Sequence, residues 1–446
     1  MIECSFFKKM SVKLMFRTLA FTMMILVSMV DSGLALGSDW SQWLGRDRNG
    51  ITPESSGWPA GWPPKKIWSK NVGKGCTSPV MVSGKMYVMG WQGEGDLNNN
   101  PIGIDTIYCL DAKTGGELWK QTYPCRYQGR LRTGDEGAYG GPSSTPTFDH
   151  KTSYLYTLSI DGDLRCWDTI KNGQLVWSKN LYDEYNVPQR PDVGGGRRDY
   201  GFTSSPLIQS DLVIVEAGDD EGNIMAFDKR NGQRKWTSKS TEFAGHSSGP
   251  VPMMVDGVKC LATLTLRKLV VMRTDKGHEG ETIAECAWQT DYANNIPTPA
   301  VVENKIIVTS SQNVSETALF EVSLKGATEK WRVKDFSQVC SPIIYKGYIY
   351  MASGPLKCLD LNDGQRKWQG GEFDHGSCLI TAGDNKVIAF GNGQLVLVEA
   401  NPSDGQYHEL SSVKDIVPDI CYPHVALSNG IICCKDKAGN MVCFSI

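Results

Sequence analysis

The sequence lacks the short motifs by which many enzymes are recognised. It contains no P-loop, no H-E-x-x-H or C-x-x-C pair, and no Ser, His and Asp in the order of a hydrolase triad. Histidine is scarce, with 6 residues in 446. These absences leave the common hydrolase and metalloenzyme classes without support, and we predict no catalytic residues and no metal site.

An apolar run long enough to cross a bilayer is also missing beyond the N-terminus, as is any excess of basic residues. The first 37 residues hold four basic and two acidic side chains, so residues 38–446 carry 42 Lys and Arg against 47 Asp and Glu, a net charge of −5. Without a basic field, nucleic acid is not an expected partner.

The N-terminus has the pattern of an export signal. A basic leader precedes the apolar residues 19–30, and small residues follow them. We expect residues 1–37 to be a signal peptide cleaved after Ala35 or Gly37, which makes the protein periplasmic or secreted, by bacterial export, with no integral membrane segment after cleavage. An uncleaved anchor and a start at Met10 are alternatives.

What the sequence does have is an internal repeat. IYCLDAKTGGELW, residues 107–119, returns as LRCWDTIKNGQLVW, IMAFDKRNGQRKW and LKCLDLNDGQRKW. In each copy a short strand ends at an Asp that can bond the turn amides, a Gly supplies the turn, and a return strand ends at Trp, which is typical of a β-hairpin. The predicted closing positions are Trp68, Trp119, Trp177, Trp236, Trp288, Trp331, Trp368 and, where Trp is lost, a place near Leu410.

A second signal, a Ser/Thr/Pro step followed by a strand pair, precedes each hairpin and gives eight copies of four strands. Their spacing is uneven, with 67 residues from Pro79 to Pro146, 60 to Pro206 and then mostly about 37 to 49. Units of about 40–50 residues favour propeller blades over the shorter rungs of an open β-solenoid. The last copy stops without its Trp strand, while the strand around Trp68 has no blade before it. We therefore predict an all-β, eight-bladed β-propeller over residues 38–446, with four-stranded antiparallel blades and the ring closed by the N-terminal strand joining the C-terminal blade.

These strings resemble the A/C-x-D-x-x-T/N-G-x-x-x-W hallmark of the PQQ-like propeller family, which includes quinoprotein alcohol dehydrogenases and a non-enzymatic lipoprotein of outer-membrane assembly. DWSQWLGRDRNG, residues 39–50, also resembles an N-terminal segment of exported bacterial PQQ-like propellers of unassigned function. The chain is more similar to the non-enzymatic and unassigned members than to the true dehydrogenases. The resemblance implies the fold, whereas the Trp motif itself carries no activity.

Several cysteines follow the repeat. Cys109, Cys166, Cys358 and Cys443 share one place, which Ala226 fills in another copy, and a place that accepts Ala or Cys is typical of tight internal packing. Removing the signal leaves thirteen of the fourteen cysteines, so at least one has no partner within the chain.

Cys433 and Cys434 raise the question of a cofactor. The resemblance to the dehydrogenases implies a disulfide between adjacent cysteines in a loop over the quinone. Here the pair stands within a predicted strand of the last blade, where alternation turns the two side chains to opposite faces. We predict no cofactor; PQQ with calcium belongs to the alternative of a quinoprotein-like oxidoreductase.

Two long stretches interrupt the repeat between blades, at residues 124–141 and 180–202, and are rich in Arg and Tyr. Such loops are commonly functional or disordered, and Arg and Tyr are favoured at binding hot spots. The residues just before each inner strand reach the same face of a propeller. The candidate ligand- or partner-binding residues are therefore Arg126, Tyr127, Arg130, Arg132, Tyr139, Tyr185, Arg197, Arg198, Tyr200, His246, Asn295, Gln338, His375 and Asp419.

Two of these candidates, His246 and His375, stand in similar strings but in blades 4 and 7, nearly opposite each other. We expect them to form hydrogen bonds at the channel mouth rather than to share a metal ion. The sequence thus predicts an exported, monomeric binding or scaffold protein that presents a loop-rich face to a protein, peptide or glycan partner. The alternative is an oxidoreductase of the PQQ-dependent alcohol dehydrogenase type.

Overall fold

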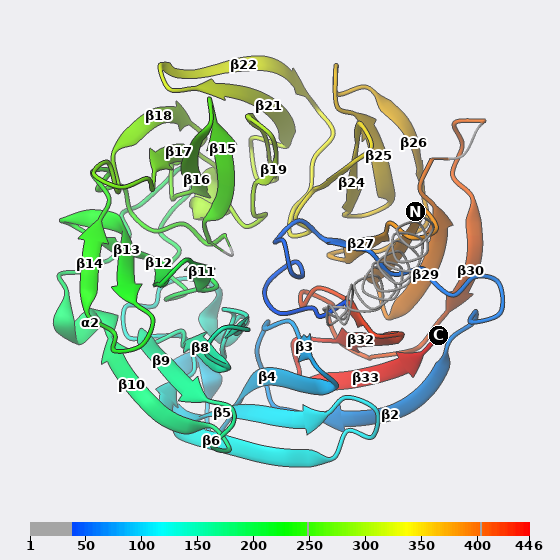
Figure 1. The fold of residues 1–446 in the computed structure, drawn as a ribbon, viewed down its shortest axis with the longest axis horizontal. Coiled ribbons are helices and arrows are strands. Elements are labelled where there is room, and N and C mark those ends of the chain that lie inside the picture. The colour runs from blue at the N-terminus through cyan, green and yellow to red at the C-terminus, as the bar shows by residue number, and fades with distance from the viewer. Residues whose placement is uncertain (1–37, 248, 402–403) are drawn as a thin grey trace, which may run out of the picture. The chain divides into compact units, whose positions relative to one another are not determined.

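The computed structural model describes residues 38–247, 249–401 and 404–446, so the signal sequence expected at residues 1–37 lies outside it. Residues 38–446 form one compact unit. Its strands make eight separate sheets, which follow one another around a central axis from blue and cyan through green and yellow to red (Figure 1). The predicted eight-bladed propeller is confirmed.

The blades run in chain order, and each begins with its innermost strand. Blade 1 comprises β3 (Val80–Val82), β4 (Lys85–Gln92), β5 (Ile102–Asp111) and β6 (Glu117–Arg126). Blade 2 comprises β7 (Thr147–Asp149), β8 (Tyr154–Leu158), β9 (Asp163–Asp168) and β10 (Gln174–Asn180). Blade 3 comprises β11 (Leu207–Gln209), β12 (Leu212–Asp219), β13 (Gly222–Asp228) and β14 (Arg234–Thr237). Blade 4 comprises β15 (Val251–Val255), β16 (Val258–Leu264), β17 (Lys268–Arg273) and β18 (Thr282–Ala287).

The second half of the ring repeats this order. Blade 5 comprises β19 (Ala300–Val302), β20 (Lys305–Ser310), β21 (Glu316–Ser323) and β22 (Gly326–Val333). Blade 6 comprises β23 (Ile343–Tyr345), β24 (Tyr348–Ala352), β25 (Leu356–Asp360) and β26 (Arg366–Gly370). Blade 7 comprises β27 (Ser377–Thr381), β28 (Lys386–Gly391), β29 (Gln394–Glu399) and β30 (Glu409–Val413). Blade 8 comprises β31 (Ala426–Ser428), β32 (Ile431–Lys435), β33 (Asn440–Ser445) and β2 (Lys65–Asn71).

Few residues lie outside the blades in regular structure. The short strand β1 (Ile51–Thr52) pairs in parallel with β27. The loops contain one short helix, α2 (Leu181–Glu184), and the 3₁₀ turns η1 (Leu97–Asn99), η2 (Asp135–Gly137) and η3 (Asp291–Ala293). Among the described residues, no helix combines the length and the apolar character that crossing a bilayer requires.

Ring closure follows the prediction made from the two incomplete copies. Strand β2 pairs antiparallel with β33, and Trp68 lies opposite Cys443. Blade 8 is thus assembled from both ends of the repeat region, which gives β33 a hydrogen-bonded neighbour where it would otherwise be an open edge.

The repeated tryptophans join each blade to the next. Trp68 Nε1 donates a hydrogen bond to the carbonyl of Ala112 in blade 1, at 2.9 Å. Its ring lies over Gly115, where a Cβ would come within 2.7 Å of ring atoms. The same ring-on-glycine contact recurs between Trp119 and Gly173, Trp177 and Gly232, and Trp331 and Gly364. The motif is therefore read across blades, because the Trp of one copy packs on the Gly of the following copy.

One of the predicted closing positions is wrong. Where the Trp was assigned correctly, it lies opposite a residue in the third strand of its blade, and the strand register shifts directly beside that pair. Trp119, opposite Cys109, is an example. In blade 4 that place is held by Ala284, opposite Val271, rather than by Trp288. In blade 7 it is held by Ser411, next to Leu410 as predicted. The hairpins of blades 4 and 7 depart most from the motif, so the closing position could not be counted reliably from the turn.

Trp288, assigned to blade 4 from the sequence, lies just after β18. Its Nε1 donates to Ser310 Oγ in blade 5, at 2.9 Å, and its side chain is buried. It therefore still joins two blades, although from a different position in the hairpin.

The cysteines of the repeat place lie opposite tryptophans, as in the pairs Cys166 with Trp177 and Cys358 with Trp368. All thirteen cysteines of the described residues are free thiols. A small side chain opposite the large Trp leaves room for the neighbouring blade, which confirms the packing role.

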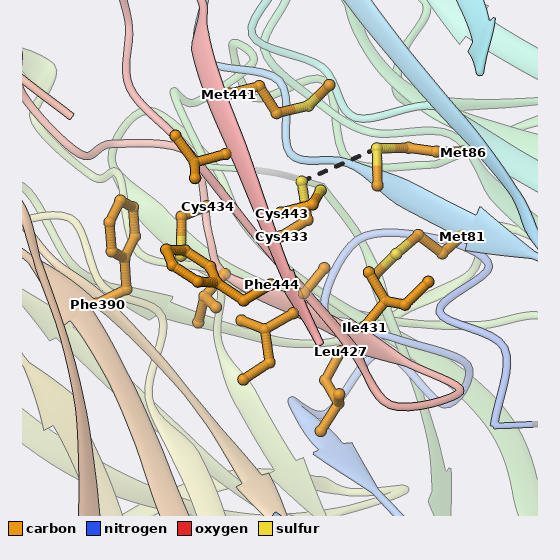
Figure 2. Packing of buried hydrophobic residues seen from close by; sticks show 14 of the residues in the cluster. Met81, Met86, Phe390, Leu427, Ile431, Cys433, Cys434, Met441, Cys443 and Phe444 are labelled. Atoms are coloured by element: carbon orange, nitrogen blue, oxygen red, sulfur yellow. Dashed lines mark hydrogen bonds between the residues drawn. The ribbon is translucent and has the colours of Figure 1, made fainter. Parts of the chain in front are cut away.

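Cys433 and Cys434 lie in β32, and their side chains face different blades as predicted. Figure 2 shows Cys433 on the side of Met86 and Cys434 on the side of Phe390. The Cys433 Sγ atom lies 3.8 Å from the Met86 Sδ atom. Both are fully buried. Burial also holds the pKa of the Cys434 thiol well above its ordinary value, so this thiol stays protonated.

The residues before each Pro form hydrogen bonds between blades. Ser78 N donates to Thr145 Oγ1 at 3.0 Å, and Thr145 N donates to Ser205 Oγ at 2.9 Å. Across the ring, Thr298 N donates to Ser341 Oγ at 3.0 Å. The Ser/Thr preference at this repeat position is explained, because each hydroxyl satisfies a buried amide of the adjacent blade.

The segment before β2 fills the channel. Its dark blue trace crosses the centre of the ring in Figure 1. Arg48 is buried and donates to the carbonyls of Ser205 at 2.7 Å and Pro206 at 3.0 Å in blade 3. The segment also contacts other blades, through the pairs Trp40 with Met81, Ser41 with Phe148, Trp43 with Thr298, Gly50 with Ile380 and Glu54 with Asn429. These contacts reach blades 1, 2, 5, 7 and 8, so a single segment of the chain is bonded to much of the ring.

Candidate functional site

The propeller has two faces that differ in their connections. Because each blade starts at its inner strand and alternates direction, all blade-to-blade loops emerge on one face, here called the loop face. The turns between third and fourth strands, such as residues 112–116 and 229–233, emerge on the other, here called the turn face. The long loops at residues 127–146 and 181–206 therefore lie together on the loop face.

The two long loops are joined to each other. Thr133 and Asp199 exchange backbone hydrogen bonds of 3.0 and 3.2 Å. Asp135 in the first loop forms an ion pair with Arg198 and accepts a hydrogen bond from the Tyr200 hydroxyl, both in the second loop. The loops thus form one continuous rim.

A buried ion pair fixes the second loop to the propeller. Arg190 Nη1 lies 2.6 Å from Asp199 Oδ1, and both side chains are largely buried. Arg190 also donates through Nε to the carbonyl of Ala244, at 2.6 Å, on the neighbouring loop. A buried charge with this many partners holds its surroundings in one arrangement.

A pocket of about 310 Å³ opens at the centre of the loop face. Trp43 of the channel segment lines it, with its ring 4.3 Å from the His424 ring. The channel segment therefore forms the inner wall. The remaining lining residues are Cys76, Asp135, Tyr139, Ser143, Ile160, Arg198, Tyr200, Thr203, His246, Tyr292, Asn294, Ile296, Gln312, Gln338, Val339, Tyr422 and His424.

Aromatic rings follow one another around much of the mouth. The ring centroids are 4.9 Å apart for His246 and Tyr200, 6.1 Å for Tyr200 and Tyr139, 5.8 Å for Tyr139 and Tyr422, and 5.5 Å for Tyr422 and His375. These are the separations at which aromatic pairs attract one another. Residues from five different loops are thereby held as a single arc.

Both histidines that line the pocket are neutral imidazoles at neutral pH. Burial, aided by the charge of Arg190, lowers the pKa of His246 well below its ordinary value. Burial lowers the pKa of His424 to about 3. His246 Nε2 lies 3.3 Å from the carbonyl of Arg198 and must carry the proton there, because a carbonyl oxygen can only accept.

Side-chain amides lie on the other part of the circumference, together with Ile296 and Val339. Asn294 precedes β19, Gln312 follows β20 and Gln338 precedes β23, so all three come from blades 5 and 6. Tyr292 stands beside them, and the guanidinium carbon of Arg198 lies 4.7 Å from the centre of its ring. The pocket therefore has an aromatic side and an amide side.

Five of the residues predicted from the sequence meet in this pocket: Tyr139, Arg198, Tyr200, His246 and Gln338. His375 and Asp419 border an adjoining hollow. Two further predicted residues are used inside the fold. Tyr127 is buried with its ring 4.8 Å from Trp91, and Asn295 donates to the carbonyls of Thr265, Leu266 and Trp288.

The other predicted residues lie on the loop face outside the pocket. Arg126 and Arg130 both pair with Asp161, at 3.0 and 3.5 Å. Arg132 donates to Gln128, and Tyr185 packs against Phe227. Arg197 is exposed and pairs with Asp192 at 3.3 Å.

Sequence reasoning missed Trp43, Tyr422 and His424. A signal for two of them exists, since most copies have Ser, Thr or Gly before the Pro and an apolar residue or Thr after it, whereas the last copy reads CYPH. Tyr422 and His424 are thus departures from the repeat. Trp43 carries no such mark, because only ring closure shows that its segment enters the channel.

The residues that line this pocket do not fit a quinone cofactor with several carboxylates and a calcium ion. Arg198 is the lining residue that is cationic at neutral pH, and Asp135 already pairs with it. The adjacent cysteines are buried in blade 8, and no group of three or more His, Cys, Asp or Glu side chains among the described residues is placed to hold a metal ion.

Comparison with known proteins gives a consistent picture. The family model described as outer membrane protein assembly factor BamB matches residues 103–370. No curated protein matches the chain significantly. Among solved structures, BamB from Moraxella catarrhalis has a TM-score of 0.56 at 10% identity, covering 86% of this chain and 100% of its own. A europium-containing methanol dehydrogenase has a TM-score of 0.51 at 12% identity, covering 91% and 92%. The computationally designed Ika8 protein has a TM-score of 0.53 at 11% identity, covering 86% and 100%. At these identities the structures share the fold alone.

Proposed function

Since this chain belongs to the family of the outer membrane protein assembly factor BamB, we propose that it is an exported, non-enzymatic scaffold that binds a protein, peptide or glycan partner with its loop face. The observation that carries the proposal is the joined rim of the two long loops. Rims of this kind, fixed before binding, lose little conformational entropy when a partner docks.

Chemical composition supports the same face. Tyrosine side chains from several loops, with Arg198, gather on it around a pocket, and tyrosine and arginine are enriched at binding hot spots. The poor fit to a quinone and calcium favours binding over redox chemistry. The apolar segment expected to act as an export signal would place the protein in the periplasm or outside the cell.

Affinity capture with paired charge reversals tests the proposal. Arg197→Glu changes an exposed, ion-paired arginine on the loop face, and Arg230→Glu changes an exposed arginine that pairs with Asp211 at 3.2 Å on the turn face. Tagged protein is incubated with periplasmic extract, and bound material is compared. We expect Arg197→Glu to lose the captured partner and Arg230→Glu to retain it. Equal capture by both variants would refute the choice of face.

A further inference from the structure

The pocket on the loop face has a chemical character that narrows its ligand. Its aromatic side is lined by Tyr139, Tyr200 and Tyr422. Its amide side offers Asn294, Gln312 and Gln338. A ligand that fills it must therefore be apolar on one side and form hydrogen bonds on the other.

The three side-chain amides are available to such a ligand. Within the described ranges, none of them hydrogen-bonds to another protein group. Each provides two N–H donors and a carbonyl acceptor. Hydroxyl groups both donate and accept, so a polyhydroxylated ligand can satisfy all of these groups at once, whereas a ligand with acceptors alone cannot.

The charges around the pocket exclude the ionic alternatives. Arg198 and Asp135 neutralise each other, and His246 and His424 are uncharged. An anion would meet the carboxylate of Asp135. A quaternary ammonium would meet Arg198, whose guanidinium already occupies a position over the Tyr292 ring.

We propose that this pocket binds a pyranose ring of a saccharide, with the C–H face of the sugar on the tyrosines and its hydroxyls on the three amides. Its volume, about 310 Å³, lies at the lower end of the range of small-ligand sites, roughly 300–1,000 Å³, which suits one compact ligand. The inference rests on the proposed function, because it specifies what the same face holds.

Ligand-observed NMR and isothermal titration on the full folded domain test this assignment. The probes are the methyl glycosides of β-glucose, β-galactose, α-mannose and N-acetyl-β-glucosamine, with tetramethylammonium chloride and sodium acetate as the ionic alternatives. We expect at least one glycoside to bind with a Kd of about 1 mM or below and the two ions not to bind.

Matched amide variants then locate the binding. Gln312→Ala and Gln338→Ala should each raise the Kd about fivefold to tenfold, since each removes hydrogen bonds to the ligand. Gln174→Ala removes an exposed amide at the start of β10 and should leave the Kd unchanged. Thermal unfolding of each variant confirms that the fold is intact.

A longer probe distinguishes a free sugar from the end of a glycan. The β-1,4- or α-1,4-linked tetrasaccharide of the sugar that binds is titrated in the same way. Binding at least as tight as that of the glycoside assigns a glycan terminus, and weaker binding assigns a free sugar; both retain the pyranose.

Three results would overturn the inference: no glycoside binds, an ion binds in preference, or Gln338→Ala behaves as Gln174→Ala does. The proposed function fails separately, when Arg197→Glu captures the partner as well as Arg230→Glu does. If Arg197→Glu loses the captured partner but no glycoside binds, the saccharide inference is refuted and the proposed scaffold function stands.

Discussion

At the scale of single residues, the glycine of the repeat has two constraints. Gly173 has a φ of +73°, which side chains disfavour, and it lies against the ring of Trp119 from the preceding blade. The residue therefore serves both the turn of its own hairpin and the junction between two blades.

A pair of alanine substitutions separates these two constraints. Gly173→Ala places a Cβ 2.5 Å from Trp119, whereas Gly257→Ala, at a φ of +79°, meets nothing within 4 Å. We expect Gly257→Ala to cost about 1 kcal/mol from backbone strain and Gly173→Ala to cost about 2–4 kcal/mol, because overpacking adds to it. Denaturant unfolding measures both. Equal losses would show that the blade contact contributes nothing.

A second residue-scale feature is a buried carboxyl in blade 1. Asp105 is fully buried in β5, and burial raises its pKa to about 7. The unfolded chain releases this proton near its ordinary pKa of about 4. Between these values the folded state binds more protons than the unfolded state, so stability falls as the pH rises from about 4 to 7.

Replacing this carboxyl should remove that part of the pH dependence. We expect Asp105→Asn to be more stable than the parent protein at about pH 8, by roughly 2–4 kcal/mol, and to lose the advantage at about pH 4. Asp111→Asn is the control, and its stability relative to the parent protein should change with pH in the opposite direction. The reason is that hydrogen bonds from the Thr114 amide and hydroxyl lower the pKa of Asp111. Thermal unfolding across this pH range checks both, and a parallel shift for Asp105→Asn at every pH would contradict the assignment.

At the scale of elements, the channel segment acts as an internal brace. Arg48 contacts carbonyls of blade 3, while Arg46, two residues earlier, is exposed. The guanidinium is buried with these partners, so truncation leaves buried carbonyls without their donor.

Removing that arginine should loosen the segment. We expect Arg48→Ala to cost about 3 kcal/mol and to speed amide exchange over residues 38–50, whereas Arg46→Ala should stay within about 0.5 kcal/mol of the parent. Denaturant unfolding and hydrogen exchange measure the two effects. Unchanged exchange in Arg48→Ala would show that the other contacts hold the segment without it.

The sequence predicted elements whose signals are local. A strand, an Asp-to-Gly turn and a Trp recur within about fifteen residues, which is enough to count blades and to pair β2 with the last copy. It failed at Trp288 and came only within one residue, near Leu410, in blade 7. The hairpins of blades 4 and 7 depart from the motif, and only strand register fixes the equivalent place.

Only some of the pocket residues were predicted, because the sequence carries local signals alone. Tyr139, Arg198 and Tyr200 stood out because the loops that carry them interrupt the repeat. Tyr422 and Trp43 come from a short loop and from the channel segment, and their approach depends on how eight blades close around one axis. Tyr127 looks equivalent to Tyr139 in the sequence, and only packing against Trp91 sets it apart.

At the scale of the whole molecule, the ring converts a repetitive chain into two unlike faces. The turn face carries the repeated hairpin turns, and the loop face carries the parts that differ from copy to copy. The repeated residues therefore build the framework, and the residues that depart from the repeat gather around the pocket. This division leads to the central claim that partners bind on the loop face.

Site-specific photo-crosslinking in the cells that produce the protein tests that claim most directly. The crosslinker is placed at Asp192 and Arg197 on the loop face and at Lys113 and Arg230 on the turn face, all exposed. We predict a discrete crosslinked partner from Asp192 and Arg197 and none from Lys113 and Arg230. Crosslinks that form from the turn face and not from the loop face would contradict the account.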